Sequence, residues 1–367
     1  MHAREVPIAA RVVTRREWAV PVRCARKRAA CGGILFGAGA LLASLAACAA
    51  PRAVVPPRFE FSRLAMGVEA RIVLHAPSEP DARAAAEAAF DTIARLDLVL
   101  SDWTATSAVS HLCAHAGQGA VAVPHELFEV LETSLELSRA TEGAFDPTVG
   151  PLVALWRRAR TLGRMPDPAE IERARERVGV HLVVLDREGR TVELARAGMQ
   201  LDFGAIGKGL ACQRAVETLA AQGIQSGLVQ MGGDIVCSDP PPGARGWSVE
   251  VGEGAPRERI LLAHHALSIS GDAEQHLVID GMRRSHVLDP RADLGLEQGV
   301  RAIVVAPDGA TADALATAAG VLGPERGVTL IARMRGCEAR IESGLPAPTR
   351  RETVGFARLE RDFAEVP

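Results

Sequence analysis

The sequence predicts an α+β fold in which antiparallel sheets are flanked by helices. Two observations indicate this class. Short apolar strands come in adjacent pairs, such as LVVL and TVEL on either side of the turn at 186–190, which is typical of hairpins. Helical stretches lie among these pairs without the regular strand–helix alternation that produces a parallel sheet. With 367 residues, of which 48% are hydrophobic, the chain can bury a sizeable core.

The individual elements follow from the spacing of apolar residues. Residues 68–76 alternate apolar and polar side chains, as a half-buried strand does, and residues 81–100 place apolar side chains at helical spacing. Further helices are predicted at 125–141, at 168–178, after Gly207 and after Ala310, and further strands at 199–203, 227–231, 247–251, 259–263, 267–270, 276–279, 284–288 and 300–305.

The N-terminal residues have the pattern of an export signal. A basic stretch at 23–28 precedes a short apolar run, and that run ends in LAAC at 45–48, which resembles a bacterial lipobox. The resemblance implies cleavage before Cys48 and lipidation of its thiol, and the alternative is an ordinary signal peptide cut near the same alanines. We therefore expect a lipid-anchored protein of the bacterial cell envelope that faces the periplasm. The expected segments are a signal at 1–47, a tether at 48–58, one globular domain at 59–345 and a loose tail at 346–367.

Charge and composition exclude one class of partner. Without residues 1–47 the chain carries 34 basic and 43 acidic residues, a net charge of −9, and the full sequence has 4% aromatic residues and no Tyr. An acidic chain with few aromatic residues is not expected to bind nucleic acid. The cysteines after Cys48 show neither a CxxC pair nor zinc spacing. An oxidising compartment would allow one disulfide, with its pairing left open among Cys113, Cys212, Cys237 and Cys337.

The stretch LDFGAIGKGLA at 201–211 predicts a strand that ends in Asp202, then a glycine turn and a helix that begins near Lys208. Glycines let backbone N–H groups approach a phosphate, and a helix N-terminus favours an anion. Lys208 is also the only lysine after residue 47. Because an ammonium is a compact charge suited to a cramped phosphate site, we interpret Lys208 as functional. The alternative is a surface lysine retained by chance.

The alanine-rich stretch ATADALATAAG at 310–320 predicts a helix with Asp313 and Thr317 one turn apart on the same face. One interpretation is that Thr311 caps the helix and that Asp313 lies in the first turn because negative charge suits the helix dipole. The other is that Asp313 and Thr317 offer hard oxygen ligands to Mg²⁺. The stretch by itself favours the first interpretation, in which Thr311 caps the helix.

Several separated motifs, taken in order, resemble the ApbE flavin transferases, and the similarity spans about residues 59–335. It implies an ApbE-like, T-fold-related architecture and Mg²⁺-dependent transfer of FMN from FAD to a protein. The motifs are MG (66–67), LSDW (100–103), AFDPTVGPL (144–152), LDFGAIGKG (201–209), MGGDI (231–235), ISGDAEQ (269–275), SHVLDP (285–290) and ATADALAT (310–317).

The resemblance also implies roles for individual residues. Its Mg²⁺ ligands correspond to Asp313, Thr317 and the carbonyl of Ala205, which favours the metal interpretation of the helix. The base that takes a proton in the reaction would be His286, with Asp272 as the second choice. The FAD contacts of the family correspond to Met66, Trp103, Ala144, Phe145, Asp146, Asp202, Lys208 and Val287.

The implied partners are FAD and a client flavoprotein whose threonine hydroxyl accepts FMN while AMP leaves. Two alternatives are hydrolysis of FAD to FMN and AMP, and a flavin-binding lipoprotein without catalysis. The chain departs from the family pattern at Gly207, where Ala is common, at Ala292–Asp293, where Thr-Gly is common, and at Cys113, where Asn is usual. These departures concern efficiency and substrate choice more than the class of reaction.

Overall fold

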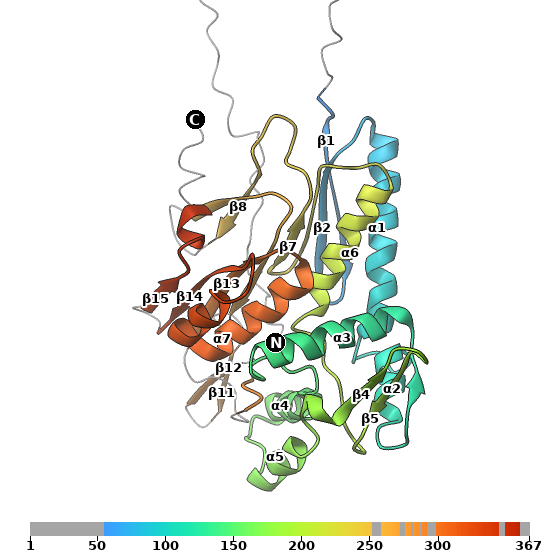
Figure 1. Ribbon diagram of the computed structural model, residues 1–367, viewed down its shortest axis with the longest axis vertical. Helices are drawn as coiled ribbons and strands as arrows, with labels where there is room; N and C mark the ends of the chain where they lie inside the picture. The colour runs from blue at the N-terminus through green and yellow to red at the C-terminus, as the bar shows by residue number, and fades with distance from the viewer. Residues whose placement is uncertain are drawn as a thin grey trace, which may run out of the picture. The chain divides into compact units, whose positions relative to one another are not determined.

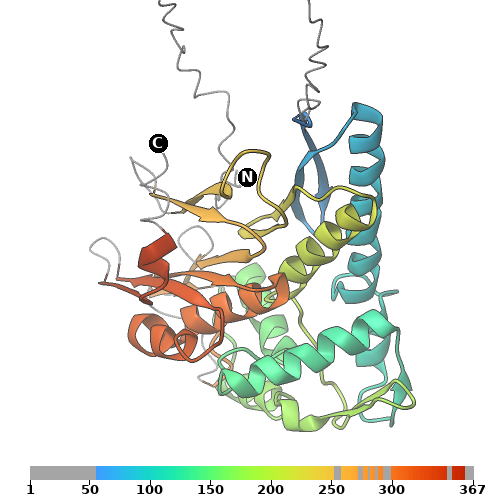
Figure 2. The same ribbon diagram turned by 45° about the horizontal axis from the view of Figure 1, so that its top comes forward.

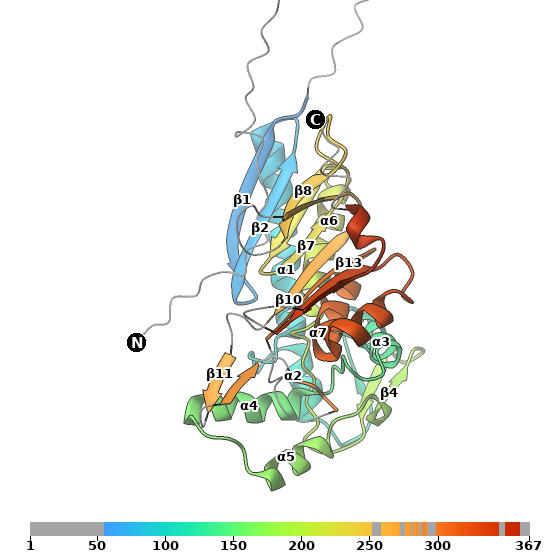
Figure 3. The ribbon, with the colours of Figure 1, turned by 90° about the vertical axis from the view of Figure 1, so that its left-hand side faces the viewer.

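The computed structural model describes residues 55–251, 258–271, 276–279, 282–285, 288–291, 299–344 and 349–359. At its centre lies an eight-stranded antiparallel sheet, which Figure 3 shows with its strands fanning from β1 to β13. In spatial order the strands are β1 (Arg58–Ala65), β2 (Val68–His75), β6 (Gly227–Met231), β7 (Asp234–Cys237), β10 (Ala266–Gly271), β13 (Val300–Ala306), β14 (Glu338–Ser343) and β15 (Thr349–Glu352).

Helices cover one face of this sheet and a hairpin covers the other (Figure 1). The helices packed on the sheet are α1 (Glu79–Leu100), α6 (Gly207–Ala221) and α7 (Gly309–Ile331); α1 packs against α6, and α6 against α7. Because side chains alternate along a strand, Ile72 and Leu74 of β2 face the helical core, whereas Val73 joins a second apolar cluster. That second cluster includes the hairpin of β8 (Trp247–Val251) and β9 (Glu258–Leu262).

A smaller region of helices and short strands completes the described chain, and Figure 2 shows its helices in green. Pro at the first turn and a capping box at Asp167 fix the start of one of these helices, α5. The elements are α2 (Ala108–Ala114), β3 (Val121–Ala122), α3 (His125–Ala140), α4 (Gly150–Leu162), α5 (Pro168–Arg175), the 3₁₀ turn η2 (Val180–Leu182), β4 (Val183–Asp186), β5 (Thr191–Leu194), and the hairpin β11 (His276–Ile279) and β12 (Met282–Ser285).

The α+β class predicted from the sequence is confirmed, but two local predictions are wrong. Residues 199–203 form no strand, because the Asp202 N–H donates to the Pro147 carbonyl (2.8 Å) and the segment lies beside a loop rather than in a sheet. The tail expected from residue 346 is not loose where it is described. Residues 349–352 pair with β14, and Phe356 is fully buried.

Three further points concern the export signal, membrane-spanning helices and the cysteines. The signal at 1–47 and the lipidated Cys48 lie outside the described residues. No helix in the described ranges is both long enough and apolar enough to cross a membrane. The four cysteines for which one disulfide was left open, Cys113, Cys212, Cys237 and Cys337, all carry free thiols.

Candidate functional site

The N-terminal turns of α6 and α7 meet at a pair of glycines. A Cβ atom on Gly209 would lie 2.0 Å from the Gly309 carbonyl oxygen, and a Cβ atom on Gly309 would lie 2.0 Å from the Gly209 carbonyl oxygen. No side chain fits between two backbones at this distance, so both positions require glycine. The contact brings the residues that follow each glycine into one small volume.

The N-cap of α7 is Asp308, whose carboxylate accepts the Thr311 N–H at 2.9 Å. The prediction that Thr311 caps this helix is therefore wrong. Asp313 points instead toward α6, where its Oδ2 accepts the Gly209 N–H at 3.1 Å, and it is 4% exposed. A buried carboxylate that faces a second helix is not explained by the dipole of its own helix.

Lys208, Asp234 and Asp313 form what we call the charge cluster. The Lys208 ammonium lies 3.4 Å from Asp234 Oδ2 and 3.5 Å from Asp313 Oδ2, and it donates to the Gly204 carbonyl at 2.9 Å. Each member comes from a different element: the first turn of α6, the start of β7 and the first turns of α7. The sheet and the two helix N-termini therefore position all three charges.

The charge cluster holds two carboxylates but one ammonium. Burial raises the pKa of Asp313, the nearby charge of Asp234 raises it further, and Lys208 only partly opposes this. Burial alone would lower the pKa of Lys208, but the two carboxylates outweigh burial and the net shift is upward. Asp234 Oδ1 is buried and has no hydrogen-bond partner within the described part of the chain. The cluster thus has an excess of negative charge and a vacant acceptor.

These features fit a bound Mg²⁺. Gly209 is the third residue of α6, where an N–H has no acceptor within the helix, and this N–H donates to Asp313. Thr317 follows Asp313 by one turn on α7. Across the described ranges no group of three or more His, Cys, Asp or Glu side chains is placed to hold a metal. Carboxylate, hydroxyl and carbonyl oxygens together are the hard donors that Mg²⁺ accepts alongside water and phosphate.

A second group, which we call the aromatic rim, consists of Asp102, Trp103, Arg157 and Asp202. Arg157, on α4, forms an ion pair with Asp102 through Nη1, and its Nη2 donates to Asp202 Oδ2 at 3.2 Å. The Arg157 guanidinium carbon also lies 4.2 Å from the centre of the Trp103 ring. One arginine therefore contacts the other three members.

Two predicted carboxylates lie in loops that run beside each other. Asp202 Oδ1 accepts the Gly204 N–H at 2.8 Å, and Asp146 Oδ1 accepts the N–H and the hydroxyl of Thr148 at 2.8 and 2.6 Å. Burial raises the pKa of both carboxylates, and at Asp202 the charge of Asp102 adds to the effect. These hydrogen bonds hold the two loops at the start of α4 and α6.

The remaining predicted residues lie in a hairpin turn, in the core or outside the described residues. Met66 occupies the turn between β1 and β2, with φ of 47°, followed by Gly67 with φ of 76°, as in a two-residue hairpin turn. Ala144 and Phe145 are 1% and 3% exposed, so their side chains belong to the core. The structure brings Lys208 together with Asp313, whereas Asp202 and Trp103 are joined only through Arg157. Asp272, His286, Val287 and Cys48 lie outside the described residues.

Sequence reasoning missed two members of these groups. Asp234 lies in the motif MGGDI at 231–235, but the resemblance assigned it no role. Arg157 belongs to the run WRRAR at 156–160, for which the sequence predicted neither a helix nor a role. The signal for Asp234 was its position directly after two glycines at a strand end, whereas nothing in the sequence distinguished Arg157 from Arg158.

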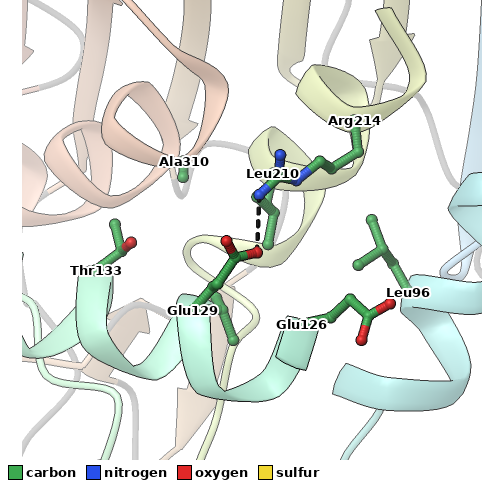
Figure 4. Close-up of a pocket in the computed structure, with 8 residues that line it drawn as sticks. Leu96, Glu126, Glu129, Thr133, Leu210, Arg214 and Ala310 are labelled. Carbon is green, nitrogen blue, oxygen red and sulfur yellow. Dashed lines mark hydrogen bonds and ion pairs between the residues drawn. The ribbon is translucent and has the colours of Figure 1, made fainter. Parts of the chain in front are cut away.

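A small cavity lies between α1, α3, α6 and α7 (Figure 4). It measures about 40 Å³, and an ion pair between Arg214 and Glu129 at 3.0 Å crosses it. Ligand sites typically have roughly 300 Å³ or more, so this cavity has room for water but not for a nucleotide. Its lining residues are Leu96, Glu126, Glu129, Val130, Thr133, Leu210, Arg214 and Ala310.

Comparison with known proteins gives these groups a context. The sequence pattern of the ApbE family matches residues 66–341. A protein of Treponema pallidum named FAD:protein FMN transferase is 33% identical over 303 residues, covering 76% of this chain and 83% of its own length. One from Salmonella typhimurium with the same name is 29% identical and covers 58% and 63%.

Solved structures agree with the sequence comparison. The apo flavinyl transferase ApbE of Pseudomonas stutzeri matches with a TM-score of 0.74 and 27% identity, over 83% of this chain and 97% of that chain. The ApbE protein of Thermotoga maritima matches with a TM-score of 0.74 and 29% identity, over 83% and 100%. A family match over most of the chain, relatives in sequence and neighbours in structure lead to one conclusion: the chain belongs to the ApbE family.

Proposed function

We propose that this protein is an Mg²⁺-dependent transferase that moves FMN from FAD to a threonine hydroxyl of a client flavoprotein and releases AMP. The observation that carries the proposal is the charge cluster, in which Asp234 and Asp313 share the single ammonium of Lys208 at the meeting point of two helix N-termini. A buried excess of negative charge suits a divalent cation, and the helix N-termini suit the phosphates that the cation would accompany. The name shared by the relatives supplies the reaction class.

Each residue of the site has a distinct task in this proposal. Asp313, Thr317 and the carbonyl of Ala205 would hold Mg²⁺, which when bound neutralises pyrophosphate charge and acts as a Lewis acid. Lys208 presents a compact positive charge to the same phosphates, and Asp234 holds that ammonium in place at 3.4 Å. The glycine turn at 204–209 keeps side chains away from the phosphate path.

The transfer step exchanges the phosphoanhydride bond within FAD for a phosphoester bond to the client. The threonine oxygen of the client forms a bond to the FMN-side phosphorus of FAD. The bond between that phosphorus and the bridging oxygen breaks, and AMP leaves with the bridging oxygen. A base must take the hydroxyl proton, and we assign this role to His286, with Asp272 as the alternative.

The test is incubation of the purified protein with FAD, Mg²⁺ and a candidate client domain, followed by mass spectrometry of the client and quantification of AMP. Transfer predicts a client heavier by one FMN on a threonine, with AMP in equal amount. Release of free FMN and AMP without a labelled client would instead identify an FAD pyrophosphatase. FAD that remains intact with Mg²⁺ would identify a flavin-binding protein without catalysis.

We also propose that the mature chain begins at a lipidated Cys48 and faces the periplasm from a membrane. The LAAC stretch at 45–48 after a basic and apolar segment supports this. Mass spectrometry of detergent-extracted protein should reveal an acylated N-terminal cysteine. An unmodified N-terminus in the soluble periplasmic fraction would favour an ordinary signal peptide. Cys48→Ser should abolish the acylation.

A further inference from the structure

We propose that Arg157 is a positioning residue that holds the ring of Trp103 as a stacking platform for the flat ring system of FAD. The inference rests on the proposed function for the identity of the ligand. Its basis is the geometry of the aromatic rim, where the guanidinium carbon of Arg157 lies 4.2 Å from the centre of the Trp103 ring. At this distance a cation stabilises the aromatic ring that it faces.

The Trp103 ring is available to a ligand although Arg157 lies against it. Its relative exposure is 76%, and it is the only aromatic residue among the strongly exposed large hydrophobic residues of the described chain. An exposed tryptophan normally loses rotational freedom when a ligand stacks on it, and this loss weakens binding. Because Arg157 already restrains the ring, stacking of a planar ligand on its open side would cost less free energy.

Arg157 is itself fixed by charge. Its Nη1 pairs with Asp102, the residue just before Trp103, and its Nη2 donates to Asp202 Oδ2 at 3.2 Å. Asp202 precedes the glycine turn that carries Lys208, so one side chain connects the aromatic rim to the loop of the charge cluster. The planar guanidinium can bridge two carboxylates and lie flat on a ring at once, whereas a lysine ammonium cannot.

A helix neighbour provides a matched control. Arg158 follows Arg157 on α4 but pairs with Glu170 at 2.5 Å and contacts no member of the aromatic rim. Both arginines are exposed enough that replacing either removes a similar surface ion pair. A difference between Arg157→Ala and Arg158→Ala therefore reports the contact with Trp103 and the two carboxylates rather than a general loss of charge from the helix.

The experiment compares FAD binding and turnover in the intact wild-type protein and in Arg157→Ala, Arg157→Lys, Arg158→Ala and Trp103→Ala. Isothermal titration with FAD gives Kd, and steady-state transfer gives KM and kcat. Arg157→Ala should raise Kd and KM for FAD by about tenfold, within the range of a partly desolvated cation–π contact, with kcat within about twofold of wild type. Arg157→Lys should not restore binding, and Arg158→Ala should bind FAD like wild type.

The double variant separates positioning from a general effect on folding. If Arg157 acts through Trp103, Arg157→Ala combined with Trp103→Ala should bind FAD no more weakly than Trp103→Ala alone. Wild-type affinity in Arg157→Ala, full rescue by Arg157→Lys, or additive losses in the double variant would overturn the proposal. Because Kd is measured without transfer, a protein that binds FAD but moves no FMN would refute the proposed function while leaving this test intact.

Discussion

The charge cluster and the aromatic rim each place one cation between two carboxylates, but they differ in burial and in the kind of cation. In the charge cluster, Asp234 and Asp313 are 2% and 4% exposed and share a compact ammonium. In the aromatic rim, Asp102 and Asp202 share a planar guanidinium that also lies against a ring exposed to 76%.

From this difference we infer which part of the proposed reaction each group controls. A buried charge pattern with an unpaired oxygen cannot relax into water, so a change there alters the stabilisation of charge during the reaction. In the aromatic rim Trp103 is exposed, Arg157 is partly exposed, and the three members other than Arg157 lie on loops, so a change there alters the affinity for a ligand more than the rate of a step. Variants that alter one group and leave the other unchanged test this division.

The largest effect is expected from Asp313→Ala in the charge cluster. The change removes a buried carboxylate that accepts the Gly209 N–H at 3.1 Å and that we assign to Mg²⁺. Losing several kcal/mol of charge stabilisation should lower transfer at least about 100-fold. The measurement is an Mg²⁺ titration of FMN transfer, accompanied by thermal melts with and without Mg²⁺.

Asp308→Ala is the control for this change, because it removes the N-cap of the same helix. It should lower stability by about 1 kcal/mol while leaving the Mg²⁺ requirement unchanged. Full activity of Asp313→Ala at low Mg²⁺ would show that Asp313 is not a required Mg²⁺ ligand.

The next effect is expected where α6 and α7 touch. A Cβ at Gly209 would lie 2.0 Å from the Gly309 carbonyl oxygen and 2.8 Å from Asp313 Cβ, so Gly209→Ala should force the two helices apart. We expect a loss of about 1–3 kcal/mol in the free energy of unfolding, together with a strong loss of transfer.

Gly207→Ala, two residues earlier, offers a comparison within the same turn. A Cβ there would meet nothing nearer than 3.9 Å, at Leu100 and Phe203, and the family commonly has Ala at this position. Urea denaturation of both variants measures the difference. Equal stability of the two would mean that the close approach of the backbones carries no constraint.

A smaller effect is expected when the ammonium of the charge cluster becomes a guanidinium. Lys208→Arg keeps the charge but introduces a wide planar group between Asp234 and Asp313, where Nζ now lies 3.4 and 3.5 Å from their oxygens. Steady-state transfer should lose at least about tenfold in kcat/KM, or about 1.4 kcal/mol, with little change in Tm. Wild-type kinetics would mean that Mg²⁺ and backbone N–H groups neutralise the phosphates without a specific role for Lys208.

The smallest effect is expected beneath the aromatic rim, at Cys113. Its thiol accepts the Leu201 N–H at 3.3 Å, where the family usually has Asn. Because an amide oxygen can accept the same hydrogen bond, Cys113→Asn should change the free energy of unfolding by less than about 1 kcal/mol and leave the KM for FAD unchanged. A marked change in KM would show that the hydrogen bond between Cys113 and Leu201 influences the binding of FAD near Asp202.

The sequence predicted the elements with clear periodicity and missed those without it. The helices α1 and α3 carry apolar side chains at helical spacing, and their predicted bounds agree with the structure to within two residues, while α6 begins at Gly207 as predicted. Strand β7 is four residues long and buried along its whole length, so it has no alternation to detect. Helix α4 begins with Gly-Pro, which reads as a turn although Pro fits the first turn of a helix.

The site was predicted only where one stretch of sequence carried the signal. Lys208 stood out as a lone lysine in a glycine turn, and Asp313 with Thr317 as two oxygens on an alanine helix. Asp234 and Arg157 act through partners that are 26 or more residues away in sequence, at Lys208 and at Asp202 and Trp103. Such pairings depend on tertiary packing, which no local pattern encodes.

The backbone contact between Gly209 and Gly309 also has a mechanical consequence. Two helices that touch without intervening side chains have no soft layer that could absorb a sliding or rotating motion. The first turns of α6 and α7 should therefore move as one rigid block, and their amide hydrogens should exchange at a common, slow rate. Entry and exit of a ligand should therefore leave the spacing of these two helix ends unchanged.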